Sequence, residues 1–210
     1  MRNIILTGLL LTVVQITNAQ ISAVTETGDP VILYEDGTWV YLNAEQIENV
    51  PIPINEKKFF KGDNSTFLVK SKKLNIGIWI DPKKWSFTRG TENDAFEYQF
   101  QKKGDDLYAM LISEKMQIPI ETLKRVAVEN AMGVAPDIKI VKQEYRTVNG
   151  IQVLMLRMEG TIQGMEVTYF GYYYSNSNGS IQLISYTGQN LFSGFKDDIV
   201  DFLNGLVEIK

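Results

Sequence analysis

The stretch Tyr145–Thr187 consists of runs of β-forming residues that turn signals interrupt three times. Asn149-Gly150 is the sharpest signal, because both residues tolerate the positive φ angles that a two-residue hairpin turn requires. Gln163-Gly164 and the stretch 176–179 mark the next two reversals. Val, Ile, Tyr, Phe and Thr fill the runs between them, which suits a pleated, half-buried surface. The pattern predicts a meander of four antiparallel strands around which the rest of the chain is organised.

The three turns also fix which residues should lie opposite one another. The first turn places Tyr145 opposite Leu154, and the second places Leu154 opposite Tyr173. The third places Gly171 opposite Ile184. Because side chains alternate between faces, one face is predicted to carry Tyr145, Leu154, Leu156, Met158, Tyr169, Tyr173, Ile184 and Tyr186. The opposite face is predicted to carry Val153, Met155, Phe170, Tyr172, Tyr174, Ile181 and Leu183, mixed with Glu144, Arg146, Arg157, Glu159 and Ser185. Neither face is purely polar, so we expect both to be covered.

Two other segments show the apolar spacing of amphipathic helices. One is 120–132, and the other is 193–207, with an apolar stripe of Phe195, Ile199, Phe202, Leu203 and Leu206. Further strands are predicted at 66–70, 76–80, 95–101, 107–113 and 138–148. This order of elements is typical of an α+β fold in which an antiparallel β-sheet meander packs against helices.

The first 19 residues have the features of a secretory signal peptide. Arg2 gives a positive start, 4–16 is mostly apolar, and small residues precede a cleavage point expected after Ala19. The apolar run is too short for a membrane-spanning helix. We therefore expect a secreted, soluble protein, periplasmic or extracellular.

The processed chain is expected to have three parts. Residues 20–43 form a small β-hairpin module, with strands at 31–34 and 38–41. Residues 44–65 contain Pro51, Pro53 and a charged cluster without a sustained hydrophobic period, and are interpreted as a linker. The main α+β domain is expected over 66–210.

Two known families are similar to these parts. The N-terminal hairpin resembles the short module with a DGTW turn found at the start of many secreted bacterial proteins. The main domain resembles the Mog1/PsbP-like superfamily, in the order and spacing of the segments 81–85, 118–121, 147–150, 151–174 and 182–187 and of the final helix. The resemblance implies an α/β/α sandwich. It also implies a role without catalysis, because members are mostly non-enzymatic: a GTPase-binding protein, photosystem extrinsic subunits and secreted bacterial proteins of unknown role. No functional residue of those proteins matches a motif here.

The amino-acid composition excludes several classes of partner and of catalytic site. The chain has 21 basic and 25 acidic side chains, a net charge of −4, which argues against nucleic acid or anionic membrane as partners. It has no Cys, and hence neither disulfides nor a lipid attached at the cleavage site. It has no His, which removes the commonest general base and the commonest metal ligand. We therefore predict no catalytic residues and no cofactor.

Three groups of residues are candidates for a site. Glu92, Asp94 and Glu97 could hold a hard cation, but their spacing matches no calcium loop, and a solvated acidic loop is the favoured interpretation, so no metal is predicted. Paired carboxylates could run a hydrolase, yet nothing singles out a pair. The third group is predicted to bind a partner and contains Arg146, Arg157, Phe170, Tyr172 and Tyr174. Packing of its aromatic rings under another layer is favoured over exposure.

These observations favour a secreted, non-enzymatic binding or accessory protein of the bacterial cell envelope. Its partner would be another envelope protein, met through a protein–protein interface. The alternative is a carrier that holds a small molecule or lipid between the sheet and a helix. A carboxylate-based hydrolase is the least favoured hypothesis.

Overall fold

The computed structural model describes residues 21–24, 30–33, 39–41, 52–91 and 94–209, with side chains described from Ile52 onward. The chain divides into two compact units, Met1–Val50 and Pro51–Lys210. In the first unit, three antiparallel strands follow one another in the sheet: β1 (Ile21–Val24), β2 (Pro30–Leu33) and β3 (Trp39–Tyr41). Strands β2 and β3 overlap the segments 31–34 and 38–41 that the sequence predicts as strands. The predicted signal peptide and residues 36–38 of the DGTW turn lie outside the described residues.

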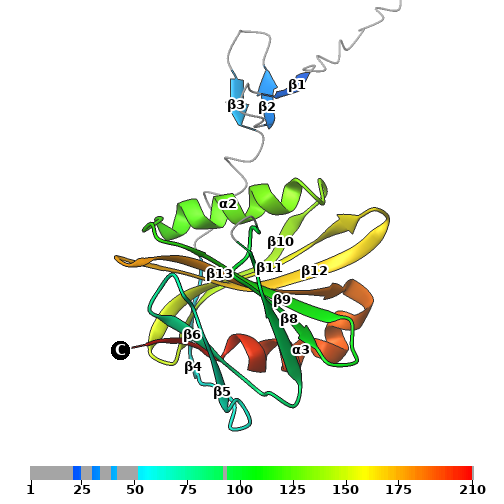
Figure 1. The fold of residues 1–210 in the computed structure, drawn as a ribbon. Coiled ribbons are helices and arrows are strands. Elements are labelled where there is room, and N and C mark those ends of the chain that lie inside the picture. The colour runs from blue at the N-terminus through cyan, green and yellow to red at the C-terminus, as the bar shows by residue number, and fades with distance from the viewer. Residues whose placement is uncertain (1–20, 25–29, 34–38, 42–51, 92–93, 210) are drawn as a thin grey trace, which may run out of the picture. The chain divides into compact units, whose positions relative to one another are not determined.

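The second unit is built on an eight-stranded sheet (Figure 1). Across the sheet the strands are β4 (Ile54–Phe59), β10 (Lys139–Val148), β11 (Ile151–Ile162), β12 (Met165–Asn176), β13 (Gly179–Gly188), β9 (Leu107–Glu114), β8 (Tyr98–Lys102) and β7 (Trp85–Arg89). Only β4 and β10 pair in parallel among these described strands. A smaller sheet has the order β14 (Leu206–Glu208), β6 (Ile76–Ile80) and β5 (Phe67–Lys70).

The meander β10–β13 has the predicted register. Tyr145 lies opposite Leu154, Leu154 opposite Tyr173, and Gly171 opposite Ile184. The hairpin turns are those that the sequence indicates, since Asn149 and Gly150 have φ angles of 47° and 89°. The turn at Gln163-Gly164 is of the same kind, with φ angles of 50° and 83°. Residues that tolerate positive φ therefore fix the pairing locally.

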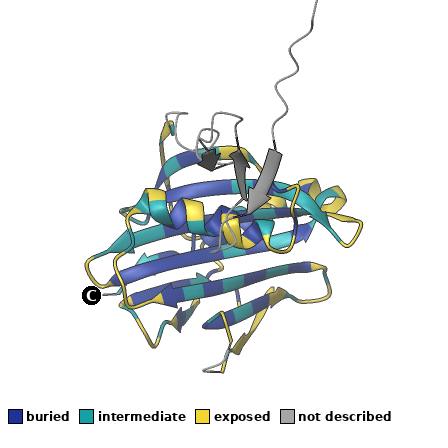
Figure 2. Ribbon diagram, turned by 90° about the horizontal axis from the view of Figure 1, so that it is seen from above, coloured by how far each residue is buried: buried dark blue, intermediate teal, exposed yellow. Residues whose placement is uncertain are grey.

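Both faces of the sheet are covered, as predicted. Helix α2 (Ile120–Met132) packs on one face, where Leu123 and Ala127 meet Leu154, Leu156 and Tyr173. Helix α3 (Gln189–Leu203) and the small sheet pack on the other face, with side chains such as Phe192, Ile199, Phe202, Ile78 and Leu206. Figure 1 shows the two helices on opposite sides of the sheet, and Figure 2, viewed from the α2 side, shows mostly buried strands beneath that helix. The result is the expected α/β/α arrangement.

The last helix differs from its prediction at both ends. It spans 189–203 and not 193–207, and the chain continues into strand β14. The reason lies at Gly205, whose carbonyl accepts a 2.8 Å hydrogen bond from the backbone N–H of Trp79. A Cβ atom there would lie 2.0 Å from the Trp79 carbonyl oxygen. This approach to β6 ends the helix, although Leu206 continues its apolar period.

Two edge strands of the eight-stranded sheet were not predicted. Strand β4 lies within the segment 44–65 interpreted as a linker, and β7 begins at Trp85, where the sequence analysis predicts no strand. Both are largely exposed, with only Phe59 buried in β4 and only Trp85 buried in β7. An exposed edge strand has little hydrophobic alternation, so its sequence resembles that of a loop.

Neither α2 nor α3 is long and apolar enough to cross a membrane, and the described residues contain no other helix that could.

Candidate binding site

The structure separates the five residues predicted to bind a partner. Phe170, Tyr172 and Arg146 are buried, with exposed fractions of 4%, 0% and 7%. They lie on the face covered by α3, where the Phe170 ring stacks on Phe192 at 6.1 Å between centroids. Packing under another layer, the interpretation favoured from the sequence, describes these three side chains. Arg157 and Tyr174 are only partly buried.

Arg146 is the centre of a buried polar network. Its Nε donates to Glu144 Oε1 at 2.6 Å, and its Nη1 donates to the Tyr172 hydroxyl at 3.0 Å. The Tyr172 hydroxyl in turn donates to Asn204 Oδ1 at 2.9 Å. The guanidinium also lies over the Phe59 ring, 4.7 Å from its centroid. The network joins β4, β10, β12 and the end of α3, which gives these residues a structural role.

The pKa shifts of Glu144 and Tyr172 agree with a structural role for this network. Burial opposes ionisation of Glu144, but hydrogen bonds from Asn55 and Arg146 outweigh it and lower the pKa of the carboxyl. Burial raises the pKa of Tyr172, although Arg146 acts in the opposite direction. Glu144 is therefore held as a carboxylate beside the guanidinium, and Tyr172 as a neutral hydroxyl.

Arg157 pairs with its neighbour on the same strand. Its Nη2 donates to Glu159 Oε1 at 2.7 Å, and its guanidinium lies 4.8 Å from the Phe192 ring centroid. The second oxygen of Glu159 accepts a hydrogen bond from Gln189 at 2.9 Å. Arg157 thus anchors the start of α3 to β11.

The acidic residues considered as ligands of a cation have different hydrogen-bond partners in the structure. Glu97 is 5% exposed and accepts hydrogen bonds from the hydroxyls of Ser71 and Ser113. Asp94 accepts from the backbone N–H and the hydroxyl of Thr91, which lowers the pKa of its carboxyl. Glu92 lies outside the described residues. The part of the chain that the structure describes contains no group of three or more potential metal ligands.

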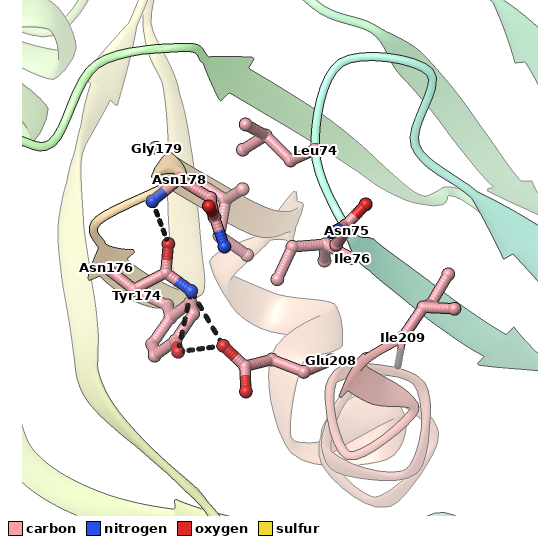
Figure 3. Close-up of a pocket in the computed structure, with 10 residues that line it drawn as sticks. Leu74, Asn75, Ile76, Tyr174, Asn176, Asn178, Gly179, Glu208 and Ile209 are labelled. Carbon is pink, nitrogen blue, oxygen red and sulfur yellow. Dashed lines mark hydrogen bonds between the residues drawn. The ribbon is translucent and has the colours of Figure 1, made fainter.

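Tyr174 lines a small cavity at the end of the β12–β13 hairpin (Figure 3). The cavity has a volume of about 120 Å³. Its polar side chains come from the hairpin, from β14 and from Asn75 before β6, and its apolar walls from Leu74, from the start of β6, from β13 and from Ile209. The lining residues are Leu74, Asn75, Ile76, Tyr174, Asn176, Asn178, Gly179, Ile181, Glu208 and Ile209.

Glu208 organises the polar side of this cavity. Its Oε1 accepts hydrogen bonds from the Tyr174 hydroxyl and, at 2.7 Å, from Asn176 Nδ2. Its Oε2 has no hydrogen-bond partner within residues 52–91 and 94–209. The Asn176 amide oxygen accepts from the backbone N–H of Asn178 at 2.8 Å, which fixes the turn. Burial and the bond to Glu208 raise the pKa of Tyr174, so the phenol remains a donor at neutral pH.

Of the residues that form this cavity, only Tyr174 was predicted for a site. Asn176 was interpreted as a turn residue, and Glu208 follows the segment that was predicted to be helical. Strand β14 brings Glu208 beside the hairpin by pairing with β6, opposite Ile76. No local pattern indicates that pairing, because it depends on where α3 ends.

Comparisons with known proteins bear on the fold. Neither a family model nor a curated protein matches the sequence. The structure is similar to cyanobacterial PsbP (CyanoP) from Synechocystis, with a TM-score of 0.52 at 11% identity over 70% of this chain and 94% of that one.

Two further solved structures are similar at lower scores. LpqN, which is involved in cell envelope biogenesis of Mycobacterium tuberculosis, has a TM-score of 0.46 at 12% identity, over 67% of this chain and 88% of that one. A protein of unknown function from Pseudomonas aeruginosa has a TM-score of 0.43 at 10% identity, over 67% of this chain and 95% of that one. The layered sheet and helices, together with the likeness to CyanoP, show that the chain has the Mog1/PsbP-like α+β fold.

Proposed function

We propose that the protein is an exported, non-enzymatic binding or accessory protein of the bacterial cell envelope, and that it acts through a protein–protein interface. The interface is assigned to the end of the molecule formed by the β12–β13 turn and β14, where Tyr174, Asn176 and Glu208 meet. Of the five residues first considered for a partner, Tyr174 belongs to this surface.

The observation that carries the proposal is the filled layer on each side of the sheet. A carrier needs an enclosed space between sheet and helix, of roughly 300–1,000 Å³ for a typical small ligand. Between α2 and the sheet, that layer is occupied by Leu123, Ala127, Leu154, Leu156 and Tyr173, which are 0–4% exposed. The cavity beside Tyr174 is smaller, about 120 Å³. This geometry favours recognition by surface contact over enclosure of a ligand.

Export is supported by the first 19 residues, whose charged start, apolar run and small-residue end are typical of a signal peptide. Expression of the full chain in a bacterium, followed by fractionation and mass measurement, tests this step. We expect the protein outside the cytoplasm, with an N-terminus at Gln20. An unprocessed chain in the cytoplasm would contradict it.

A photo-crosslinking amino acid at Asn178 tests the interface. Asn178 is exposed and lines the cavity, so a partner seated there should be captured. The control places the same group at Glu166, which is exposed near the other end of β12. We expect an adduct with an exported protein at position 178, lost when excess unlabelled protein competes. Equal capture at both positions, or no capture at either, would refute the proposed interface.

A further inference from the structure

We propose that the cavity beside Tyr174 binds a single basic side chain, lysine or arginine, of a protein partner. The inference rests on the proposed function in one respect, namely that the occupant belongs to a protein. It adds the chemistry by which that partner is recognised.

The charge of the cavity comes from one residue. Among the ten lining residues only Glu208 carries a charge, and the rest are neutral. Its Oε1 is already shared by Tyr174 and Asn176, whereas Oε2 has no hydrogen-bond partner in the described part of the chain. In Figure 3 this second oxygen points away from the two bonds that hold the first. A carboxylate in this state accepts a further charge-assisted hydrogen bond from an ammonium or guanidinium group.

The carboxylate is also held in place before any partner arrives. Glu208 belongs to β14, which pairs with β6 opposite Ile76. The bonds from Tyr174 and Asn176 fix its side chain from the neighbouring hairpin. A group that is already ordered loses little conformational freedom on binding, so more of the interaction energy appears as affinity.

The size and the walls of the cavity fit one side chain. Its volume of about 120 Å³ is far below the roughly 300–1,000 Å³ typical of pockets for whole small molecules. Leu74, Ile76 and Ile209 provide apolar wall beside the carboxylate. Lysine and arginine combine an aliphatic stem with a charged end, and thus match both parts. A hard metal ion would need more oxygen ligands than one carboxylate supplies.

Titration of the isotope-labelled processed chain, residues 20–210, with two tripeptides tests the inference by NMR. The probes are acetyl-Gly-Lys-Gly-amide and its norleucine counterpart, which has a similar stem without the charge. We expect the lysine peptide to shift the amide signals of Asn178, Gly179 and Ile209. The norleucine peptide should bind about tenfold more weakly or worse, because it lacks the hydrogen bond to a charged acceptor.

The substitution Glu208→Gln keeps the shape of the side chain and removes its charge, and should reduce binding of the lysine peptide about tenfold. Glu166→Gln makes the same change of net charge at a different site, near the far end of β12, and should leave binding unchanged. Equal binding of both peptides, no binding of either, or no effect of Glu208→Gln would overturn the inference. Each of these results can occur while crosslinking at Asn178 still captures a partner, so the proposed function and the inference can fail separately.

Discussion

Tyr172 and Tyr174 lie two residues apart on the same strand and on the same face of the sheet, yet their surroundings differ. Tyr172 is fully buried beneath α3, and its hydroxyl accepts from Arg146 and donates to Asn204. Tyr174 is partly exposed and donates to Glu208 at the cavity. The first hydroxyl is part of the core, and the second is available to organise a surface.

This difference predicts unequal costs for removing the two hydroxyls. In Tyr172→Phe, Arg146 and Asn204 each lose a buried partner, so we expect the free energy of unfolding to fall by about 1–3 kcal/mol. Tyr174→Phe is the matched control and should cost less than about 1 kcal/mol, because water can replace its bond. Urea unfolding of both variants measures the costs. Equal losses would show that the buried network does not stabilise the fold as described.

A two-residue period indicates that Phe170, Tyr172 and Tyr174 share a face, and this prediction is confirmed by the strand register. The same period cannot show which residues of the strand are covered by another layer of the fold. That depends on the path of α3, which is set by contacts between segments far apart in the sequence. For this reason the sequence identifies Tyr174 as a candidate but not Asn176 or Glu208, its partners in the cavity.

At the scale of elements, a glycine inside α3 and one just after it have opposite requirements. Gly205 leaves no room for a side chain, since a Cβ would lie 2.0 Å from the Trp79 carbonyl oxygen. Gly194 lies within α3 in open space, where a Cβ atom would meet nothing within 4 Å. Only the first glycine is required by packing.

Alanine substitutions at these glycines should therefore change stability in opposite directions. Gly205→Ala should lower the free energy of unfolding by about 2 kcal/mol or more, because the β14–β6 junction must open. Gly194→Ala should raise it by about 0.4–1 kcal/mol, through higher helix propensity and a less flexible unfolded chain. Thermal unfolding with calorimetry separates the two. A neutral Gly205→Ala would contradict the stated reason for the helix end.

Two aspartates of α3 predict opposite dependences on pH. Asp198 bonds Lys84 Nζ at 2.7 Å and Lys102 Nζ at 2.9 Å. Burial opposes its ionisation, but these bonds prevail and lower the pKa of its carboxyl. Burial raises the pKa of Asp201, one turn further along the helix. The ionised form of Asp198 thus stabilises the folded chain. Ionised Asp201 destabilises it, because its carboxylate is more favourable in the unfolded chain than in the folded one.

At pH 7, Asp198→Asn should lower the free energy of unfolding by about 1 kcal/mol or less, a partly exposed pair being screened by water. Asp201→Asn should raise it slightly. The contribution of Asp198 is present above the ordinary aspartate pKa and is lost as pH falls through its lowered folded value, while the penalty at Asp201 disappears on acidification. Urea unfolding at pH 7 and at about pH 3 measures both effects, which should be smaller at the lower pH. Two shifts of the same sign at pH 7 would refute this assignment.

The elements that could be predicted are those whose signal is local. The hairpin turns have residues suited to positive φ, and the core-facing helix α2 has the bounds expected from its apolar spacing. Strands β4 and β7 have no such signal because they lie at the edges and bury one residue each, Phe59 and Trp85. Their positions are set by pairing with β10 and β8, which only the assembled sheet determines.

At the scale of the whole molecule, β4 decides where the second unit begins. It pairs in parallel with β10, and its Phe59 is buried against the Arg146 guanidinium. Asn55 also donates to Glu144 at 3.0 Å. Strand β4 belongs to the compact unit Pro51–Lys210, whereas the sequence predicts the main domain over 66–210, and we propose that the folded domain includes β4.

Two truncated chains test this boundary. A chain that begins at Pro51 retains β4 and every described member of the two hydrophobic clusters, so its free energy of unfolding should match that of residues 20–210 within about 1 kcal/mol. A chain that begins at Thr66 loses Phe59, leaves Glu144 without Asn55, and exposes β10 as a new sheet edge. Burial of one large apolar side chain alone stabilises by about 1.5–3 kcal/mol, so we expect a loss of at least about 3 kcal/mol. Urea unfolding followed by fluorescence and far-ultraviolet circular dichroism compares the three chains. If the chain from Thr66 were as stable as the chain from Pro51, β4 would be an appendage of the sheet, and the boundary would return to the position that the sequence predicts.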